Sequence, residues 1–130
     1  MTTDLTREHS VQAAIMREFN HGDMRLYRNN VGMAFAGKPE KRNGVTSIRN
    51  AYPVRYGLAV GSADLIGYRM VTVTPDMVGK KLAVFVSVEA KDDKGRARPE
   101  QVAWCEQIKR AGGIAVVARS VKDVYKELNK

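Results

Sequence analysis

The carboxylate of Glu89 and the ammonium group of Lys91 follow an apolar stretch of the sequence, with one alanine between them. Residues 84–88 alternate valine with phenylalanine and serine, a pattern that predicts a β-strand. Side chains two residues apart in a strand project from the same face, so we expect Glu89 and Lys91 to lie side by side. A carboxylate suits Mg²⁺ or Mn²⁺, and a neighbouring lysine could orient water or stabilise negative charge. The pair is typical either of a metal-dependent site or of a surface ion pair contributing about 0–1 kcal/mol.

The composition predicts one globular domain, residues 1–130, with an excess of basic side chains. Lys and Arg number 22 and Asp and Glu 14, which gives a net charge of +8 and favours a polyanionic partner. The single cysteine, Cys105, excludes an internal disulfide framework and favours a reducing compartment, so we expect a cytoplasmic protein. No apolar run is long enough to span a bilayer, and we expect no membrane partner.

Apolar periodicity predicts a helix at each end of the chain, over residues 6–21 and 121–128. Thr6 and Ser120 are of the residue types that cap helix starts. We expect the first helix to bury an apolar stripe, and Glu8 and Gln12 to share another face of it. The stripe consists of Val11, Ala14, Ile15 and Phe19.

The middle of the chain predicts strands over residues 24–29, 64–73 and 82–91, the last two as an antiparallel hairpin. That hairpin would bring Asp64 close to Glu89. A helix from Pro99 and an apolar strand over 114–118 then predict a parallel, right-handed crossover.

Residues 37–62 are the least regular part of the sequence, and they mix glycine and proline with basic and aromatic side chains. This composition predicts either a mobile surface loop or a loop that holds phosphates and stacks on bases. The basic residues that we expect to contact a polyanion are Lys38, Lys41, Arg42, Arg49 and Arg55, together with Arg96 and Arg98.

Taken in order, these motifs resemble the VRR-NUC domain of the PD-(D/E)xK nuclease superfamily. The resemblance covers essentially the whole chain. The nominal Pro-Asp of the superfamily is Ala63-Asp64 here, and the Val-Arg-Arg element is loose. The stretches that carry it are Glu8 with Gln12, Arg28–Gly32, Gly61–Asp64, Val88–Lys91, Arg98–Gln101 and Gly113–Ser120.

The resemblance implies an α/β, restriction-endonuclease-like fold, a mixed central sheet flanked by helices in the order helix, three strands, helix, strand, helix. It implies that Asp64, Glu89 and the backbone carbonyl of Ala90 bind Mg²⁺ or Mn²⁺, with Glu8 as a further ligand directly or through water. Lys91 would orient the attacking water or stabilise the transition state, and Gln101 would hold Lys91 or the scissile phosphate. The implied catalytic set is Glu8, Asp64, Glu89, Lys91 and Gln101.

Single-domain members of this kind, viral or bacterial, resemble Holliday-junction resolvases and act as homodimers. The resemblance therefore implies a metal-dependent, structure-selective DNA endonuclease, with branched DNA and a second copy as partners and no organic cofactor. Two alternatives stay open: a nuclease for flaps, nicks or linear duplex, and a nucleic-acid-binding module without catalysis.

Overall fold

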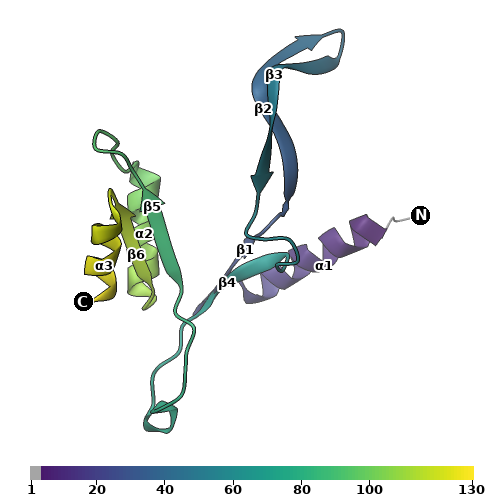
Figure 1. The fold of residues 1–130 in the computed structure, drawn as a ribbon. Coiled ribbons are helices and arrows are strands. Elements are labelled where there is room, and N and C mark those ends of the chain that lie inside the picture. Colours follow the sequence, from purple (N-terminus) through teal and green to yellow (C-terminus); the bar gives the residue numbers. More distant parts are fainter. Residues whose placement is uncertain (1–3) are drawn as a thin grey trace. The chain divides into compact units, whose positions relative to one another are not determined.

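The computed structural model describes residues 4–130, and these form two compact units. The first unit comprises residues up to 21 and residues 25–67, and the second comprises 22–24 and 68–130. Helices and strands are both present, so the chain belongs to the α/β class (Figure 1). The prediction of one domain over residues 1–130 stays a prediction.

Helix α1 (Asp4–Phe19) opens the described chain and includes Thr6, so Thr6 is not the cap that the sequence predicts. The predicted apolar stripe of this helix is not buried: Val11 is 57% exposed, Ile15 37% and Phe19 49%. Helical periodicity identifies the face that can be buried, but it does not determine whether another element covers it.

Strands β1 (Met24–Arg28) and β4 (Leu65–Arg69) pair with each other. Backbone hydrogen bonds from Asn29 N–H to the Asp64 carbonyl and from Met70 N–H to the Asp23 carbonyl show that they run antiparallel. The pairing requires a glycine at residue 67, because a Cβ there would lie 1.8 Å from the carbonyl oxygen of Arg25.

The segment that the sequence predicts to be irregular forms a long hairpin of β2 (Gly32–Arg42) and β3 (Val45–Tyr56) (Figure 1). Asn43 and Gly44 connect the strands with φ angles of 52° and 76°. Positive φ at both central residues is the geometry of a two-residue hairpin turn, and Asn-Gly is its preferred sequence. The prediction of a loop is therefore wrong. The pairing register of β2 and β3 shifts once, between Ala36 and Lys38.

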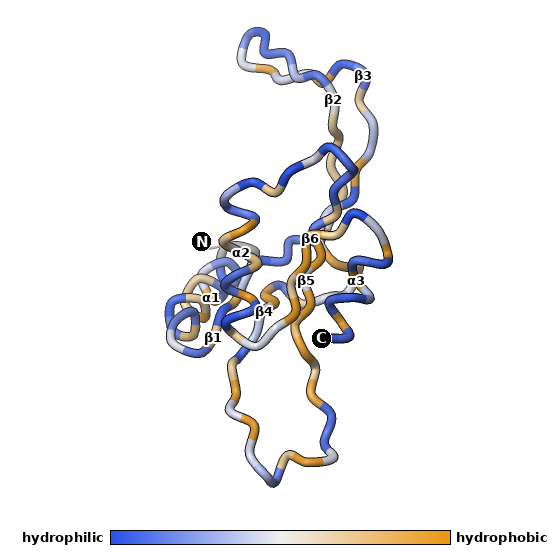
Figure 2. The backbone as a smooth tube through the Cα atoms, turned by 90° about the vertical axis from the view of Figure 1, so that its left-hand side faces the viewer, coloured by the Kyte–Doolittle hydropathy of each residue, from blue (hydrophilic) through white to orange (hydrophobic). Residues whose placement is uncertain are grey.

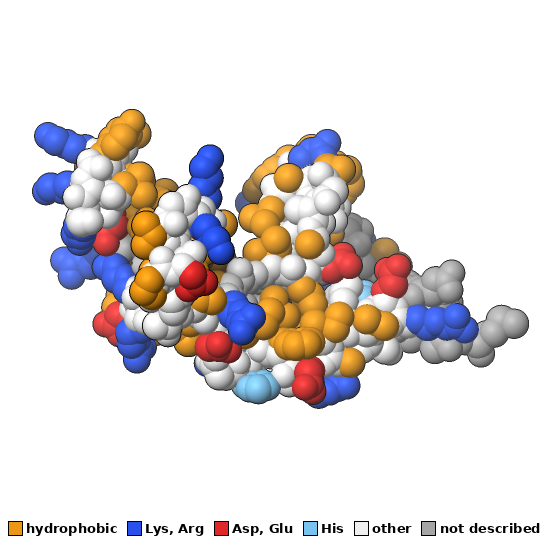
Figure 3. Space-filling model, turned by 90° about the horizontal axis from the view of Figure 1, so that it is seen from below, with side chains coloured by type: hydrophobic (Ala, Val, Ile, Leu, Met, Phe, Trp, Pro, Cys, Tyr) orange, Lys and Arg blue, Asp and Glu red, His pale blue; other side chains and the backbone are white. Residues whose placement is uncertain are grey.

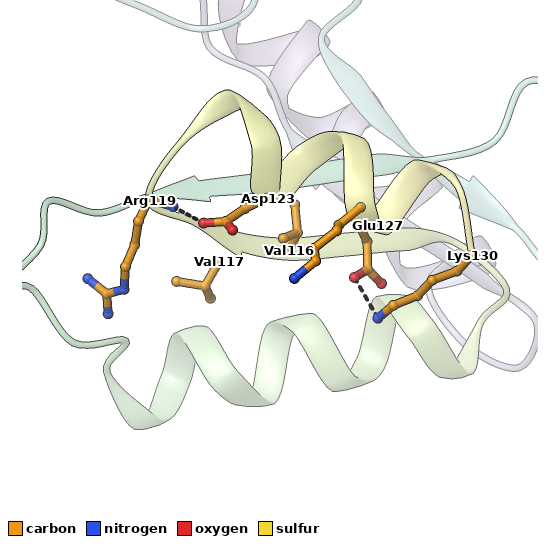
Figure 4. Close-up of a pocket in the computed structure, with 7 residues that line it drawn as sticks. Val116, Val117, Arg119, Asp123, Glu127 and Lys130 are labelled. Atoms are coloured by element: carbon orange, nitrogen blue, oxygen red, sulfur yellow. Dashed lines mark hydrogen bonds and ion pairs between the residues drawn. The ribbon is translucent and has the colours of Figure 1, made fainter.

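The second unit is organised around β5 (Val86–Ala90), α2 (Pro99–Arg110), β6 (Ile114–Ala118) and α3 (Val121–Leu128). β5 and β6 are parallel and are joined through α2, which confirms the predicted parallel connection, while its right hand stays a prediction. α2 packs against both strands and α3 packs against β6, on opposite sides of the strand pair (Figure 4). The two strands form an apolar stretch in Figure 2, with Ala115 and Ala118 buried in β6 and Ile108 buried in α2.

The strands of residues 4–130 form three two-stranded sheets, β1–β4, β2–β3 and β5–β6. The predicted antiparallel pairing of segments 64–73 and 82–91 is therefore wrong, because β4 pairs with β1 and β5 with β6. Between β4 and β5 lies irregular chain with one short helical turn, η1 (Pro75–Met77). These three pairs do not form the mixed central sheet that the resemblance implies. Five strands precede α2, whereas the implied order has three.

β5 is buried on one face only. Its valines at 86 and 88 are about half exposed, whereas Ser87 and Glu89 are less accessible and face α2. Further large apolar side chains are exposed on the β2–β3 hairpin, in residues 70–84 and on α3, and hydrophobic side chains reach the surface in Figure 3. Among the described residues, no helix has the length and apolar character needed to cross a membrane.

Candidate active site at the end of β5

Three of the side chains predicted to be catalytic meet at the end of β5. The Lys91 Nζ atom lies 3.1 Å from Glu89 Oε1, and Gln101 Nε2 donates a hydrogen bond of 2.7 Å to the same oxygen. The side chain of Lys91 is 18% exposed and that of Glu89 is 36% exposed. We call these three residues the Glu89 cluster. The predicted side-by-side placement of Glu89 and Lys91 is confirmed.

Gln101 is oriented by the start of α2. Its Oε1 atom accepts a hydrogen bond of 2.9 Å from the backbone N–H of Arg98, which is the N-cap residue. A side chain at the third helical position that accepts from the N-cap amide is one half of a capping box. With its oxygen used in this way, the amide nitrogen of Gln101 points to Glu89. The family resemblance implies that Gln101 holds Lys91 or the scissile phosphate; its partner in the structure is Glu89.

A hydrogen bond and aromatic contacts hold α2 on β5 behind the cluster. Trp104 Nε1 donates to Ser87 Oγ at 2.8 Å. The ring of Phe85 makes edge-to-face contacts with Trp104 and with Tyr68, at centroid distances of 6.3 and 5.7 Å. Phe85, Ser87 and Glu89 alternate along one face, so Trp104 and Gln101, nearly one helical turn apart, contact successive positions on that face.

The predicted metal ligand Asp64 lies in the first unit, exposed and directly before β4. The loop that leads to it is held by Asn29, which is 8% exposed. Asn29 Nδ2 donates to Ser62 Oγ and to the Ala63 carbonyl, both at 2.8 Å, and its Oδ1 accepts from Leu58 N–H at 3.0 Å. These bonds anchor both ends of residues 58–63 to the end of β1.

Glu8 also lies in the first unit, on α1, and is exposed. Its predicted neighbour Gln12 accepts a hydrogen bond of 3.2 Å from Arg28 NH1, which ties α1 to the end of β1. This contact gives Gln12 a structural role.

A divalent ion requires several oxygen, nitrogen or sulfur donors close together. Within the described chain, no three side chains of His, Cys, Asp or Glu gather in an arrangement that could hold a metal ion. Mg²⁺, however, is commonly bound through only one or two carboxylates, with water and substrate phosphates completing its shell. The Glu89 carboxylate and the Ala90 carbonyl, at the same strand end, are hard oxygen donors of the kind that Mg²⁺ or Mn²⁺ takes. The residues present are therefore chemically suited to such an ion.

The basic residues predicted to contact DNA are all exposed. Most of them lie on the β2–β3 hairpin: Lys38, Lys41 and Arg42 on β2, and Arg49 and Arg55 on β3. Arg96 lies between β5 and α2. At the start of α2, the Nε atom of Arg98 lies 3.4 Å from Glu100 Oε1.

A second group of charged side chains lines a pocket between β6 and α3 (Figure 4). Asp123 accepts a hydrogen bond from Arg119 N–H at 2.9 Å, and Glu127 Oε2 lies 2.8 Å from Lys130 Nζ. The hydrogen bond from Lys130, with the charges of Lys130 and Lys109, holds the pKa of Glu127 below its ordinary value despite partial burial. Glu127 is thus paired with Lys130, and Asp123 accepts from a backbone amide, which indicates a structural arrangement.

Comparisons with protein-family models, with curated proteins and with solved structures find no match for this chain. The resemblance to the VRR-NUC domain therefore stays a prediction from the sequence motifs.

Three features of the candidate site are absent from the sequence predictions. Asn29 lies in a motif of the family resemblance, but a buried asparagine is recognisable only from its partners far along the chain. The Trp104–Ser87 bond likewise depends on tertiary packing. The β2–β3 hairpin did have a local signal, the Asn43-Gly44 dipeptide.

Proposed function

We propose that the chain is a metal-dependent, structure-selective DNA endonuclease that hydrolyses phosphodiester bonds, with four-way junctions as its preferred substrate. The observation that carries the proposal is the Glu89 cluster, in which a carboxylate is held between Lys91 and Gln101 at a strand end. A net charge of +8 supports a polyanionic substrate. The proposal includes a restriction-endonuclease-like arrangement around β5, α2 and β6 and a cytoplasmic location.

In this proposal each residue of the Glu89 cluster has a distinct task. Glu89 and the Ala90 carbonyl, with Asp64 and Glu8 as further candidates, would hold Mg²⁺ or Mn²⁺, which supplies charge neutralisation and a more acidic water. The ammonium group of Lys91 orients the attacking water or stabilises the negative charge that develops on the phosphate. Gln101 keeps the Glu89 carboxylate in one orientation through its hydrogen bond.

We also propose that the enzyme acts as a homodimer, because a two-fold pair presents two active sites to a branched DNA with two equivalent strands. The exposed apolar side chains at the root of the hairpin, which include Phe35, Tyr52 and Tyr56, support association. Sedimentation equilibrium tests this part directly: a mass of one chain at micromolar concentration contradicts it.

The decisive experiment is a cleavage assay with Mg²⁺ and Mn²⁺ on a four-way junction, a 5′ flap and a linear duplex. We expect Lys91→Ala to lower junction cleavage at least about a hundredfold, since it removes the charge-stabilising group. Lys94→Ala is the matched control, because Lys94 is an exposed lysine in the loop that follows. Equal losses in both variants would contradict the assignment.

The same assay distinguishes the alternative functions. Preferential cutting of flap or linear duplex, still dependent on Lys91, indicates a nuclease of different substrate choice. Binding without cleavage under either metal ion indicates a non-catalytic nucleic-acid-binding module.

A further inference from the structure

In the outer half of the β2–β3 hairpin, residues 38–49, the charged side chains are divided between two faces. Opposite residues of an antiparallel pair point to the same face, as do alternate residues along each strand. The register pairs Lys38 with Arg49 and Arg42 with Val45. One face, which we call the Arg49 face, consists of Lys38, Glu40, Arg42, Val45, Ser47 and Arg49. The other, the Lys41 face, consists of Pro39, Lys41, Thr46 and Ile48.

We propose that the hairpin is a DNA-binding arm that lays its Arg49 face against the phosphates bordering the groove of a duplex. The inference rests on the proposed function in taking DNA as the partner, and it assigns the contact to one face of one element. Charge supports it, because three of the four basic side chains of the outer half lie on this face.

The dimensions of the hairpin fit a duplex groove. The strands are 11 and 12 residues long, and every residue of β3 is exposed, so both faces are accessible to a partner. A two-stranded β-ribbon can enter the major groove, which is about 12 Å wide. Lys38 and Arg42 are four residues apart on one strand, a separation of about 14 Å, which is comparable with that width.

Glu40 lies within the Arg49 face and gives the inference a distinctive consequence. Its Oε1 atom lies 2.8 Å from Arg49 NH2, and both side chains are more than half exposed. The carboxylate thus repels approaching phosphates and occupies the guanidinium group that would bind them. Removing this negative charge should therefore strengthen DNA binding.

The test measures binding of a fluorescein-labelled duplex and of a labelled four-way junction by anisotropy, in EDTA and at several salt concentrations. The first variants are Lys38→Ala, Arg42→Ala and Arg49→Ala. We expect each to weaken binding about threefold to tenfold and to reduce the slope of log K against log salt by about 0.9, the effect of one lost phosphate contact. Circular dichroism checks that each variant keeps the fold.

Two further variants make the test specific for the face. Lys41→Ala removes one positive charge from the same hairpin but from the Lys41 face. The sequence predicts that Lys41 contacts DNA, whereas the proposed face excludes it, so we expect less than about a twofold change in affinity. Glu40→Gln should bind about threefold more tightly, with a steeper salt dependence.

Three outcomes overturn the inference. They are a Lys41→Ala loss equal to that of Arg42→Ala, unchanged binding by all three Arg49-face variants, and wild-type binding to phosphatidylserine vesicles but not to duplex. Because EDTA prevents metal-dependent cleavage, the binding data are independent of catalysis. The predicted face dependence without cleavage under Mg²⁺ or Mn²⁺ would support the arm and refute the endonuclease, whereas Lys91-dependent cleavage with no face dependence would do the reverse.

Discussion

Replacement of Asn29 by alanine tests the network that anchors the loop before Asp64. The side chain is 8% exposed and makes three hydrogen bonds, two as donor, to Ser62 and Ala63, and one as acceptor, from Leu58. Alanine removes all three bonds, which are partly buried, and leaves the polar groups of the loop without this partner. We expect the loop over residues 58–63 to detach from the end of β1 more often.

The magnitude follows from the number of bonds. Each hydrogen bond contributes about 1 kcal/mol to the free energy of unfolding, so three correspond to a loss of about 3 kcal/mol. This is a large part of the roughly 5–15 kcal/mol that stabilises a typical domain. With a urea m-value of about 1.5 kcal/mol/M, the unfolding midpoint should fall by about 2 M.

Urea unfolding followed by far-UV circular dichroism measures this loss, and Asn20→Ala is the matched control. Asn20 also makes side-chain hydrogen bonds with the backbone, to the Leu26 carbonyl at 3.2 Å and from the Leu26 N–H at 3.3 Å, but it is exposed. Water replaces exposed bonds at little cost, so we expect the control to lose less than about 1 kcal/mol.

Hydrogen exchange at single residues adds a local measurement. The Leu58 amide, which donates to Asn29 Oδ1, should lose its protection in Asn29→Ala and keep it in Asn20→Ala. If Asn29→Ala costs no more than the control and the Leu58 amide stays protected, the network does not hold the loop.

Two further predictions concern the second unit. Gln101→Glu keeps an acceptor for Arg98 N–H but replaces the donor to Glu89 with a second carboxylate. We therefore expect little change in melting temperature and a loss of about tenfold to a hundredfold in cleavage, and unchanged cleavage would refute the assigned role of Gln101. The lowered pKa of Glu127 stabilises the fold above the ordinary value of 4.5, and this contribution is lost as the pH falls through the lower folded-state pKa. Glu127→Gln should therefore lower the urea midpoint at neutral pH and lower it progressively less as the pH falls below 4.5, and a loss that does not change with pH would contradict the role of Lys130.

Local sequence was sufficient for the elements around the Glu89 cluster. The alternation of residues 84–91 predicts that Glu89 and Lys91 share a face, because the side-chain period of a strand is two residues. Ser120 was correctly predicted as a cap, and its Oγ accepts from Asp123 N–H. Pro99 and the apolar strand over 114–118 likewise predict the β5–α2–β6 crossover. The shared face and the cap depend on interactions between residues close together in the chain, and the crossover was predicted from the order of the three elements.

The β2–β3 hairpin shows where a local signal was outweighed by composition. Residues 37–57 are basic and rich in glycine and proline, which predicts a loop, but the Asn43-Gly44 turn matches the twist of an antiparallel pair. The alternation of basic residues between the two faces is also present in the sequence. Which residues share a face depended on the pairing register, including its shift after Ala36.

By itself, the sequence determined the order of β5, α2, β6 and α3, the face shared by Glu89 and Lys91, and the excess of positive charge. Tertiary structure alone decided that β4 pairs with β1, that Gln101 donates to Glu89, and that Asn29 is buried with its bonds satisfied. The physical reason is the separation along the chain of the residues that interact. Periodicity and capping arise from neighbours within a few residues, whereas strand pairing and buried polar networks join distant segments whose compatibility no single segment encodes.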